Sequence, residues 1–272
     1  MNVPDMQLTD IDGLELEVYD RGSGGPVVFV HAAREDWYGV LKEPALAENY
    51  RLIYYHRRGY GRSSKTGIPL TDEQHAGECL AVMRHLGVER AHMAGLSGGA
   101  VVLLFFARDF PHAVHTLALL EPALVNTLDD DPEFQQLLAK VGALIEAGDV
   151  PAGLDTFLQG VVAPNYAELF DRTLALGWWA RLIDDSDTLS AEMAAANSAQ
   201  FTAEDAARIE VPVLNMMGGD TRPMYRKIHQ TVDAWIPHAE SVVLPDTTHA
   251  MPQTNPKGTA ERLADFFSRH PL

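Results

Sequence analysis

The sequence predicts an α/β fold, in which a mostly parallel, doubly wound sheet of eight strands carries an inserted helical segment. Three observations support this prediction. Short, continuous apolar runs such as "VVFV" at 27–30 are typical of strands that helices cover on both faces. Helical patterns fall between these runs. Residues 122–209 interrupt the alternation, because they contain helical patterns and no convincing strand.

The first two strands are expected to form a hairpin at one edge of the sheet. They are separated by Gly13, and Leu14, Leu16 and Val18 of the second strand alternate as in a half-buried strand. The eight predicted strands are "MQLTDID" at 6–12, "LELEVYD" at 14–20, "PVVFVHA" at 26–32, "RLIYYH" at 51–56, "AHMAGL" at 91–96, "HTLALLE" at 115–121, "VPVLNMM" at 211–217 and "SVVLPD" at 241–246.

Helix boundaries follow from capping residues and from glycine and proline. Thr71 begins a helix with Gln74 placed to complete a capping box, and Gly87 ends it. Asn255 and Pro256 open the last helix, in which three apolar side chains share a face: Leu263, Phe266 and Phe267.

About four helices are expected in residues 122–209, which we call the inserted segment. They begin near Asp131, Pro151, Pro164 and Asp187, and the third should carry two tryptophans, Trp178 and Trp179. Active sites of open α/β sheets lie at the carboxyl ends of the strands. We therefore expect residues 1–121 and 210–272 to form the core domain and residues 122–209 to form a helical cap over that edge.

Gly95-Leu96-Ser97-Gly98-Gly99 matches the G-x-S-x-G pattern of a nucleophile elbow. The bare pattern is common, and a glycine-rich turn with Ser97 as helix N-cap would also explain it. The context favours the elbow, because the motif follows a predicted strand and precedes a predicted helix. Ser97 is therefore the candidate nucleophile.

A serine hydroxyl needs a base to accept its proton, and His249 is the candidate. It follows the last predicted strand and precedes the last helix, in "VVLPDTTHAMPQTNP", so it should lie in a loop at the sheet edge. Other histidines have ordinary explanations, since His75 and His85 fall within a helix and His270 is near the end of the chain.

Over essentially its full length the chain resembles an α/β-hydrolase fold protein with a helical cap, similar to esterases and lactone hydrolases of that fold. The resemblance rests on "VFVHA" with His31, "YYHRRGYGRSS" with Arg58, Gly59, Gly61 and Ser63, the elbow at Ser97, and "THAMPQTNP" with His249. The second motif resembles the family's D-x-R-G-x-G-x-S turn, with His56 in place of aspartate. Because this turn is mainly architectural in the family, we expect His56 to be structural.

The resemblance leaves two candidates for the acid that orients His249. Most family members place an aspartate after the seventh strand, and "MMGGDTRPMY" offers Asp220 one position earlier than usual, with Thr221 at the expected place. Glu121, at the end of the sixth strand, matches relatives such as certain haloalkane dehalogenases and resorcylic lactone hydrolases that use a glutamate there. We favour Glu121 and keep Asp220 as the alternative; Asp246 is a weaker candidate.

By the same resemblance, the backbone N–H groups of Ala33 and Gly98 should form the oxyanion hole. Where the family usually has His-Gly, this chain has His31-Ala32. Because a side chain disfavours positive φ, the backbone at Ala32 is expected to differ from that of a glycine in the same loop. Four further residues are candidates for substrate binding: Arg34, Trp37, Trp178 and Trp179. Arg34 would hold a substrate carboxylate, and tryptophans in a cap favour a largely apolar substrate.

Composition excludes several other classes of function. The chain of 272 residues has 21 Lys and Arg against 38 Asp and Glu, a net charge of −17, which repels nucleic acid and anionic lipid. No signal-peptide pattern or membrane-spanning run is present, and the single cysteine, Cys79, excludes an internal disulfide, so we expect a cytoplasmic location. No metal-binding motif is present, and we expect no cofactor or metal.

The sequence therefore predicts a cofactor-independent serine hydrolase that cleaves an ester or lactone of a small, largely apolar molecule. An aspartate-nucleophile dehalogenase or epoxide hydrolase is disfavoured, because the elbow carries serine. Carbon–carbon bond or thioester hydrolysis remains an alternative within the fold. A noncatalytic ligand-binding protein built on the same scaffold is an alternative of a different class.

Overall fold

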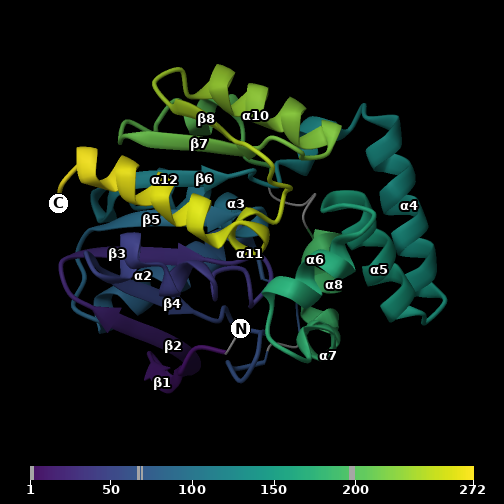
Figure 1. Ribbon diagram of the computed structural model, residues 1–272, viewed down its shortest axis with the longest axis horizontal. Helices are drawn as coiled ribbons and strands as arrows, with labels where there is room; N and C mark the ends of the chain where they lie inside the picture. The colour runs from purple at the N-terminus through teal and green to yellow at the C-terminus, as the bar shows by residue number, and fades with distance from the viewer. Residues whose placement is uncertain (1–2, 66–67, 69, 196–199) are drawn as a thin grey trace.

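The computed structural model describes residues 3–65, 68, 70–195 and 200–272 (Figure 1). Its centre is one eight-stranded sheet in the order β1-β2-β4-β3-β5-β6-β7-β8. The strands are β1 (Gln7–Ile11), β2 (Leu14–Gly22), β3 (Gly25–Val30), β4 (Tyr50–Tyr55), β5 (Ala91–Leu96), β6 (Val114–Leu120), β7 (Val213–Gly218) and β8 (Glu240–Leu244). The order and the mostly parallel pairing confirm the predicted doubly wound α/β fold.

The first two strands form the predicted hairpin. Ile11 pairs with Leu14, and Gly13 between them has a φ of +84°, a conformation that glycine adopts without strain. β2 continues antiparallel to β4, whereas every later pair is parallel. The antiparallel part is therefore confined to one edge, and all carboxyl ends of β3 to β8 point the same way (Figure 1).

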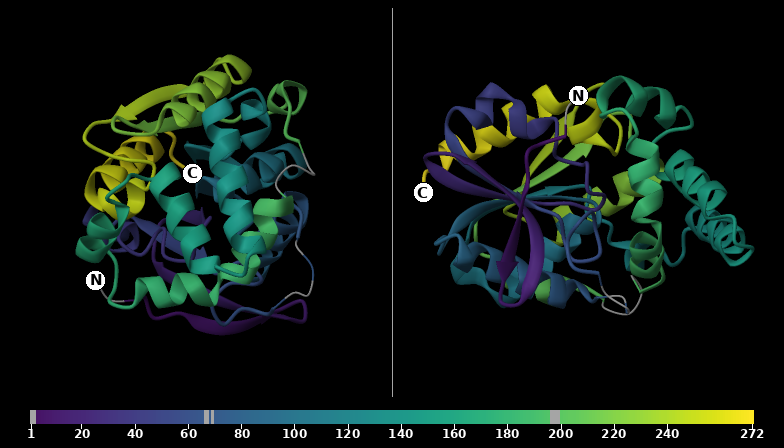
Figure 2. Two further views of the ribbon diagram at one scale, coloured as in Figure 1. Left: turned by 90° about the vertical axis from the view of Figure 1, so that its right-hand side faces the viewer. Right: turned by 90° about the horizontal axis from the view of Figure 1, so that it is seen from below.

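Helices cover both faces of the sheet (Figure 2). One core cluster packs α2, α3 and α10 against one face, and the other packs α1 and α12 against the opposite face. The α-helices outside the inserted segment are α1 (Pro44–Ala47), α2 (Asp72–His85), α3 (Gly98–Asp109), α10 (Pro223–Trp235), α11 (Met251–Thr254) and α12 (Pro256–Arg269). Short 3-10 helices lie at Val40–Lys42, Pro111–Ala113 and Val125–Leu128. Coverage of both faces explains why the central strands are continuous apolar runs.

The helix caps that the sequence predicts are present at the start of α2 and of α12. Thr71 and Gln74 form a reciprocal capping box at the start of α2, and Gly87, with a φ of +68°, follows its end. The Asn255 side chain accepts the N–H of Gly258 at the start of α12, 3.0 Å away. No helix in the described part of the chain is long and apolar enough to cross a membrane.

Between β6 and β7, the described residues of the inserted segment form helices and no strand. The helices are α4 (Pro132–Glu146), α5 (Val150–Val161), α6 (Tyr166–Thr173), α7 (Trp178–Asp184), α8 (Ser186–Ala195) and α9 (Ala203–Ala206). The expected third helix is in fact two, because Gly177 at a φ of 83° separates α6 from α7. Figure 1 shows α4 to α8 grouped beyond the carboxyl edge of the sheet, and the left view of Figure 2 looks onto them.

Candidate active site

Ser97 lies in a sharp turn between β5 and α3. Its φ of 53° and ψ of −120° form a backbone conformation that residues with a side chain rarely adopt. Two glycines make room for the turn. A Cβ at Gly95 would lie 2.7 Å from the carbonyl oxygen of Gly99, and one at Gly99 would lie 2.3 Å from that of Val30. The half-buried Ser97 hydroxyl is thus presented at the carboxyl edge of the sheet.

A carboxylate and an imidazole meet in the same cavity. Glu121 follows β6 directly, and its Oε2 lies 2.6 Å from Nδ1 of His249. Both side chains are buried. Two more donors hold the carboxylate: the Gly218 N–H donates to Oε1 at 2.8 Å, and the Thr221 hydroxyl donates to Oε2 at 2.9 Å. Because Nδ1 faces Glu121, the other ring nitrogen of His249 remains for a different partner.

The other two candidate acids do not contact His249. The side chains of Asp220 and Asp246 are exposed, and no hydrogen bond in the described part of the chain joins either of them to the imidazole. The backbone N–H of Asp220 donates to the carbonyl of Thr247 at 2.9 Å, which places Asp220 in a turn. The structure therefore brings Glu121 to His249 and leaves Asp220 outside the site.

Tyr225 is a site residue that the sequence motifs do not identify. Its ring stacks on the imidazole of His249, with centroids 3.9 Å apart and planes at 8°. The Ser97 hydroxyl lies close enough to the Tyr225 phenol to lower its pKa, against the larger effect of burial, which raises it. Burial, together with the charge of Glu121, raises the pKa of Tyr225, so the phenol is neutral near pH 7. The available signal was a tyrosine in the first turn of the helix after β7, at the same sheet edge as Ser97.

The loop after β3, which was expected to supply an oxyanion-hole amide, is held by Asp36. Its Oδ2 accepts the N–H of Ala32 at 2.7 Å and that of Ala33 at 2.9 Å, and its Oδ1 accepts Nε2 of Gln253 at 2.7 Å. Burial raises the pKa of Asp36 to about 7, although the two amide hydrogen bonds lower it. Ala32 avoids positive φ. Ala33 N–H thus faces Asp36, whereas Gly98, the first residue of α3, has no acceptor for its N–H within the helix.

Ser97 and Tyr225 lie where two lobes of a cavity meet, since both residues line each lobe. His249 lines the first lobe, whose remaining wall is mainly apolar and comes largely from the inserted segment: Phe157, Phe170, Leu174, Trp178 and Leu182. The second lobe combines apolar side chains with the polar groups of Arg57, Asp72, His75 and Glu192. The cavity is therefore apolar on one side of the serine and partly polar on the other.

The polar groups of the second lobe include a buried ion pair between the core and α8. Arg57 donates to both carboxylate oxygens of Glu192, at 2.8 and 2.9 Å, and His75 Nε2 lies 3.0 Å from Oε1. Burial opposes ionisation of Glu192, but Arg57 and His75 lower its pKa to about 2. Burial and the charge of Arg57 lower the pKa of His75 to about 4. Burial raises the pKa of Asp72 to about 6, and this carboxylate has no hydrogen-bond partner in the described part of the chain.

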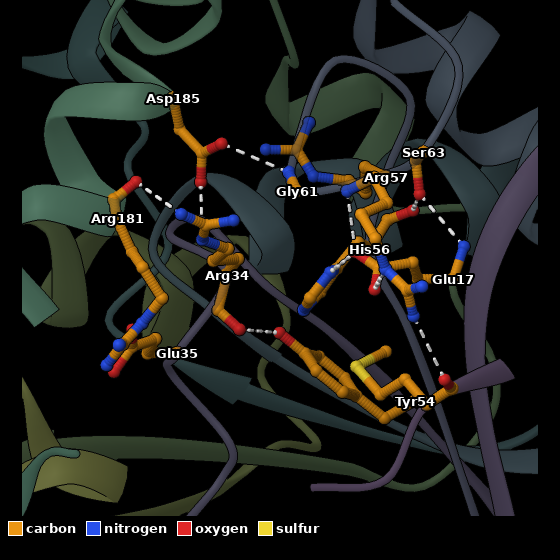
Figure 3. Close-up of polar contacts among 12 residues, drawn as sticks. Glu17, Arg34, Glu35, Tyr54, His56, Arg57, Gly61, Ser63, Arg181 and Asp185 are labelled. Atoms are coloured by element: carbon orange, nitrogen blue, oxygen red, sulfur yellow. Dashed lines mark hydrogen bonds and ion pairs between the residues drawn. The ribbon is translucent and has the colours of Figure 1, made fainter. Parts of the chain in front are cut away.

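Arg34 joins the loop after β3 to the inserted segment (Figure 3). Its Nε lies 2.9 Å from the Asp185 carboxylate, and its NH2 donates to the carbonyl of Arg181 at 2.6 Å. Arg181 in turn pairs with Glu35, and Asp185 accepts the N–H of Gly61 at 3.0 Å. Arg34 lines the first lobe, but its guanidinium is bound to Asp185. The expectation that it holds a substrate carboxylate is therefore replaced by a role in joining the loop to α7 and α8.

His56 lies in a buried network within the core (Figure 3). Its Nδ1 lies 2.8 Å from the Glu17 carboxylate, and its Nε2 lies 3.0 Å from the Tyr38 hydroxyl. The Ser63 hydroxyl donates to the carbonyl of His56 at 2.8 Å and accepts the N–H of Glu17 at 3.0 Å. Burial opposes ionisation of Glu17, but hydrogen bonds from His56 and Arg62 lower its pKa to about 2. These contacts give His56 a structural place between β2 and the turn after β4.

The three tryptophans proposed for the pocket have different positions. Trp37 is fully buried, donates from Nε1 to the carbonyl of Val30 at 3.0 Å and packs on Phe29, so it belongs to the core and not to the cavity. Trp178 lines the first lobe. Trp179 packs edge-on against Trp178 and lines neither lobe, because adjacent residues of a helix point about 100° apart. In the described residues, no three His, Cys, Asp or Glu side chains are grouped to hold a metal ion.

Comparisons with known proteins agree with this architecture. A non-heme haloperoxidase from Rhodococcus erythropolis is 28% identical over 275 residues, which cover 96% of this chain and 98% of that protein. A bifunctional esterase/perhydrolase from Acinetobacter calcoaceticus is 26% identical, with 96% and 98% covered. The structure of an α/β hydrolase from Sphaerobacter thermophilus DSM 20745 matches with a TM-score of 0.77 and 27% identity, covering 97% of this chain and 100% of that one. Since the family model of the α/β-hydrolase fold matches residues 25–256, the chain belongs to the α/β-hydrolase fold family.

Proposed function

We propose that this protein is a cofactor-independent serine hydrolase that cleaves a carboxylic ester or lactone through Ser97, His249 and Glu121. The observation that carries the proposal is the 2.6 Å contact between Glu121 Oε2 and His249 Nδ1, in a cavity that Ser97 also lines. A serine in an elbow, an imidazole and an orienting carboxylate are the parts that acyl transfer requires. The esterase name of one relative fits the same reaction class.

The reaction assigns one task to each group. Ser97 attacks the substrate carbonyl while His249 accepts the hydroxyl proton, and Glu121 stabilises the imidazolium that forms. The tetrahedral intermediate collapses to an acyl-enzyme as His249 returns the proton to the leaving oxygen. Water then attacks the acyl group while His249 accepts its proton. His249 returns that proton to Ser97 as the carboxylic acid is released. The Gly98 N–H, at the start of α3, is a donor for the oxyanion.

The inserted segment supports the choice of substrate class. We propose that residues 122–209 act as a cap, because α5, α6 and α7 supply much of the apolar wall of the first lobe. An apolar acyl or alcohol group would be desolvated there beside Ser97. The second lobe, with the carboxylate of Asp72 among its polar groups, suits a substrate part that carries a hydrogen-bond donor.

A second candidate function is ligand binding without turnover. One observation favours it: the Ala33 N–H, which the oxyanion hole of the family would use, donates to Asp36. An acyl-transfer site with only one amide donor would stabilise its transition state less, since each donor contributes roughly 3 to 4 kcal/mol.

A fluorophosphonate probe and a panel of nitrophenyl esters and lactones test the proposal. We expect labelling and turnover in the wild type and the loss of both in Ser97→Ala. Ser268→Ala, which changes an exposed hydroxyl of α12, is the matched control and should behave as wild type. A wild type that binds the probe esters but is neither labelled nor turns them over would favour the binding function.

A further inference from the structure

Tyr225 carries the inference, which rests on the proposed hydrolase reaction. It reaches Ser97 from a direction that none of the family motifs supplies, from the first turn of α10 after β7. Its ring lies flat on the imidazole of His249, and its phenol lies near the Ser97 side chain, with which it lines both lobes of the cavity. A side chain that stacks on the base, lies near the nucleophile and lines both lobes of the cavity is placed to meet the reacting carbonyl of a substrate bound beside Ser97.

The site also lacks one of its two expected amide donors. The Ala33 N–H is 2.9 Å from Asp36 Oδ2, and the same oxygen accepts the Ala32 N–H at 2.7 Å. Gln253 holds the other oxygen of that carboxylate, so Asp36 has partners on both sides. The oxyanion that forms on the substrate when Ser97 attacks would compete with the Asp36 carboxylate for the Ala33 N–H. An ionised Asp36 would also repel that oxyanion.

We propose that the Tyr225 hydroxyl is a catalytic group that donates a hydrogen bond to the substrate carbonyl oxygen as it becomes the oxyanion, alongside the Gly98 N–H. A phenol at this position takes over the part of the Ala33 amide. No movement of the loop after β3 is required, because the Tyr225 hydroxyl already lies near Ser97.

The proton and electron movements balance with the phenol as a donor throughout. In the resting site the Tyr225 phenol lies near the Ser97 hydroxyl. When Ser97 Oγ bonds to the carbonyl carbon, its proton passes to His249 and the C=O π electrons move onto oxygen. The phenol O–H then points to that oxygen and keeps its own proton, because burial and the nearby Glu121 charge raise the pKa of Tyr225. Collapse of the intermediate re-forms the C=O bond and frees the phenol.

Tyr225→Phe separates this role from packing, because it keeps the ring that stacks on His249 and removes only the hydroxyl. We expect kcat for a nitrophenyl ester to fall roughly 10²- to 10³-fold, with KM changed by less than about threefold. Tyr166→Phe is the matched control: it also removes a buried phenol, one that donates to Asp155 at 2.7 Å outside the cavity, and it should keep wild-type turnover.

A boronic acid that adds to Ser97 gives a second measurement that does not depend on turnover. The boronate is tetrahedral and places an oxygen where the oxyanion forms, so its Kd should rise by about the same factor as kcat falls in Tyr225→Phe. A purely structural role for the phenol would leave this Kd unchanged in a variant that stays folded.

Two results overturn the inference. If the wild type turns esters over, Ser97→Ala abolishes turnover, and Tyr225→Phe retains kcat and boronate Kd within about twofold of wild type, the phenol is no oxyanion donor while the hydrolase function stands. If the wild type shows neither labelling nor turnover, the hydrolase function and the inference fail together.

Discussion

Glu121→Gln is the substitution that tests the core of the proposed mechanism. Three donors converge on the two oxygens of Glu121: Nδ1 of His249 at 2.6 Å, the Thr221 hydroxyl at 2.9 Å and the Gly218 N–H at 2.8 Å. Glutamine offers one oxygen and one NH2 group in the same space. Its NH2 must therefore face at least one of these donors.

Both orientations of the glutamine amide impair the base. If the oxygen stays on Gly218, the NH2 faces His249, which must then accept at Nδ1 and carry its proton on the other nitrogen, where it cannot take a proton from Ser97. If the amide is flipped, an NH2 faces the Gly218 N–H and leaves it without an acceptor, which costs about 1 to 3 kcal/mol. In either case the charge that stabilises the imidazolium is lost.

The expected loss is large enough to measure cleanly. Removal of the orienting carboxylate in a serine protease lowers turnover by roughly 10⁴-fold, equal to about 5.4 kcal/mol in the activation free energy. We therefore expect kcat for a nitrophenyl ester to fall roughly 10³- to 10⁴-fold in Glu121→Gln. Asp220→Asn, which alters an exposed carboxylate, should stay within about threefold of wild type. Retention of kcat within tenfold in Glu121→Gln, or collapse in Asp220→Asn, would refute the assignment.

Two further predictions test the loop after β3 and the apolar wall of the first lobe. The folded-state pKa of Asp36, about 7, lies above the ordinary value of 3.8, so its ionisation destabilises the fold as the pH rises through that range. The free energy of unfolding of Asp36→Asn relative to wild type should therefore increase from about pH 4 to pH 7 and then level off in urea titrations. Gln253 can accommodate the new NH2 by rotating its amide, because its Oε1 has no partner in the described structure. A difference that does not change with pH would contradict the burial of an ionising carboxyl. Trp178→Leu should shift the kcat/KM ratio of long-chain to short-chain esters roughly tenfold toward the long chain, whereas Trp179→Leu should not; equal shifts would place both rings at the cavity.

Much of the fold follows from patterns that are local in sequence. The strands are recognisable because both faces of the sheet are covered, which leaves continuous apolar runs such as 27–30. The capping box at Thr71 and the elbow glycines are equally local, since each depends on atoms a few residues away. The division between α6 and α7 was missed, although Gly177 marks it, because the tryptophans after it continue the apolar pattern.

The site residues that the sequence misplaced or missed are positioned by contacts between residues far apart in the chain. Arg34 had the expected position at the cavity, but its partner Asp185 lies 151 residues further along the chain (185 − 34), between α7 and α8. Trp37 lies in the same loop as Arg34, but its indole donates to the carbonyl of Val30 at the end of β3 and packs in the core. Tyr225 approaches Ser97 only because β7 and β5 end at the same sheet edge, on either side of β6. The spacing of residues along the chain does not predict these contacts.

The position of the acid depends both on the order of the strands and on the local backbone conformation at the end of β6. β6 lies between β5 and β7, so a side chain at its end is equally placed to reach the elbow after β5 and the loop after β7. Glu121 has a φ of 42°, which ends the strand abruptly and turns the carboxylate toward β7, where the Gly218 N–H and the Thr221 hydroxyl receive it. Thr221 occupies the place where most family members carry the aspartate, and here it donates to the carboxylate instead of supplying one. The position after β7 therefore still contributes to orienting His249, as a hydrogen-bond donor to an acid that comes from the neighbouring strand.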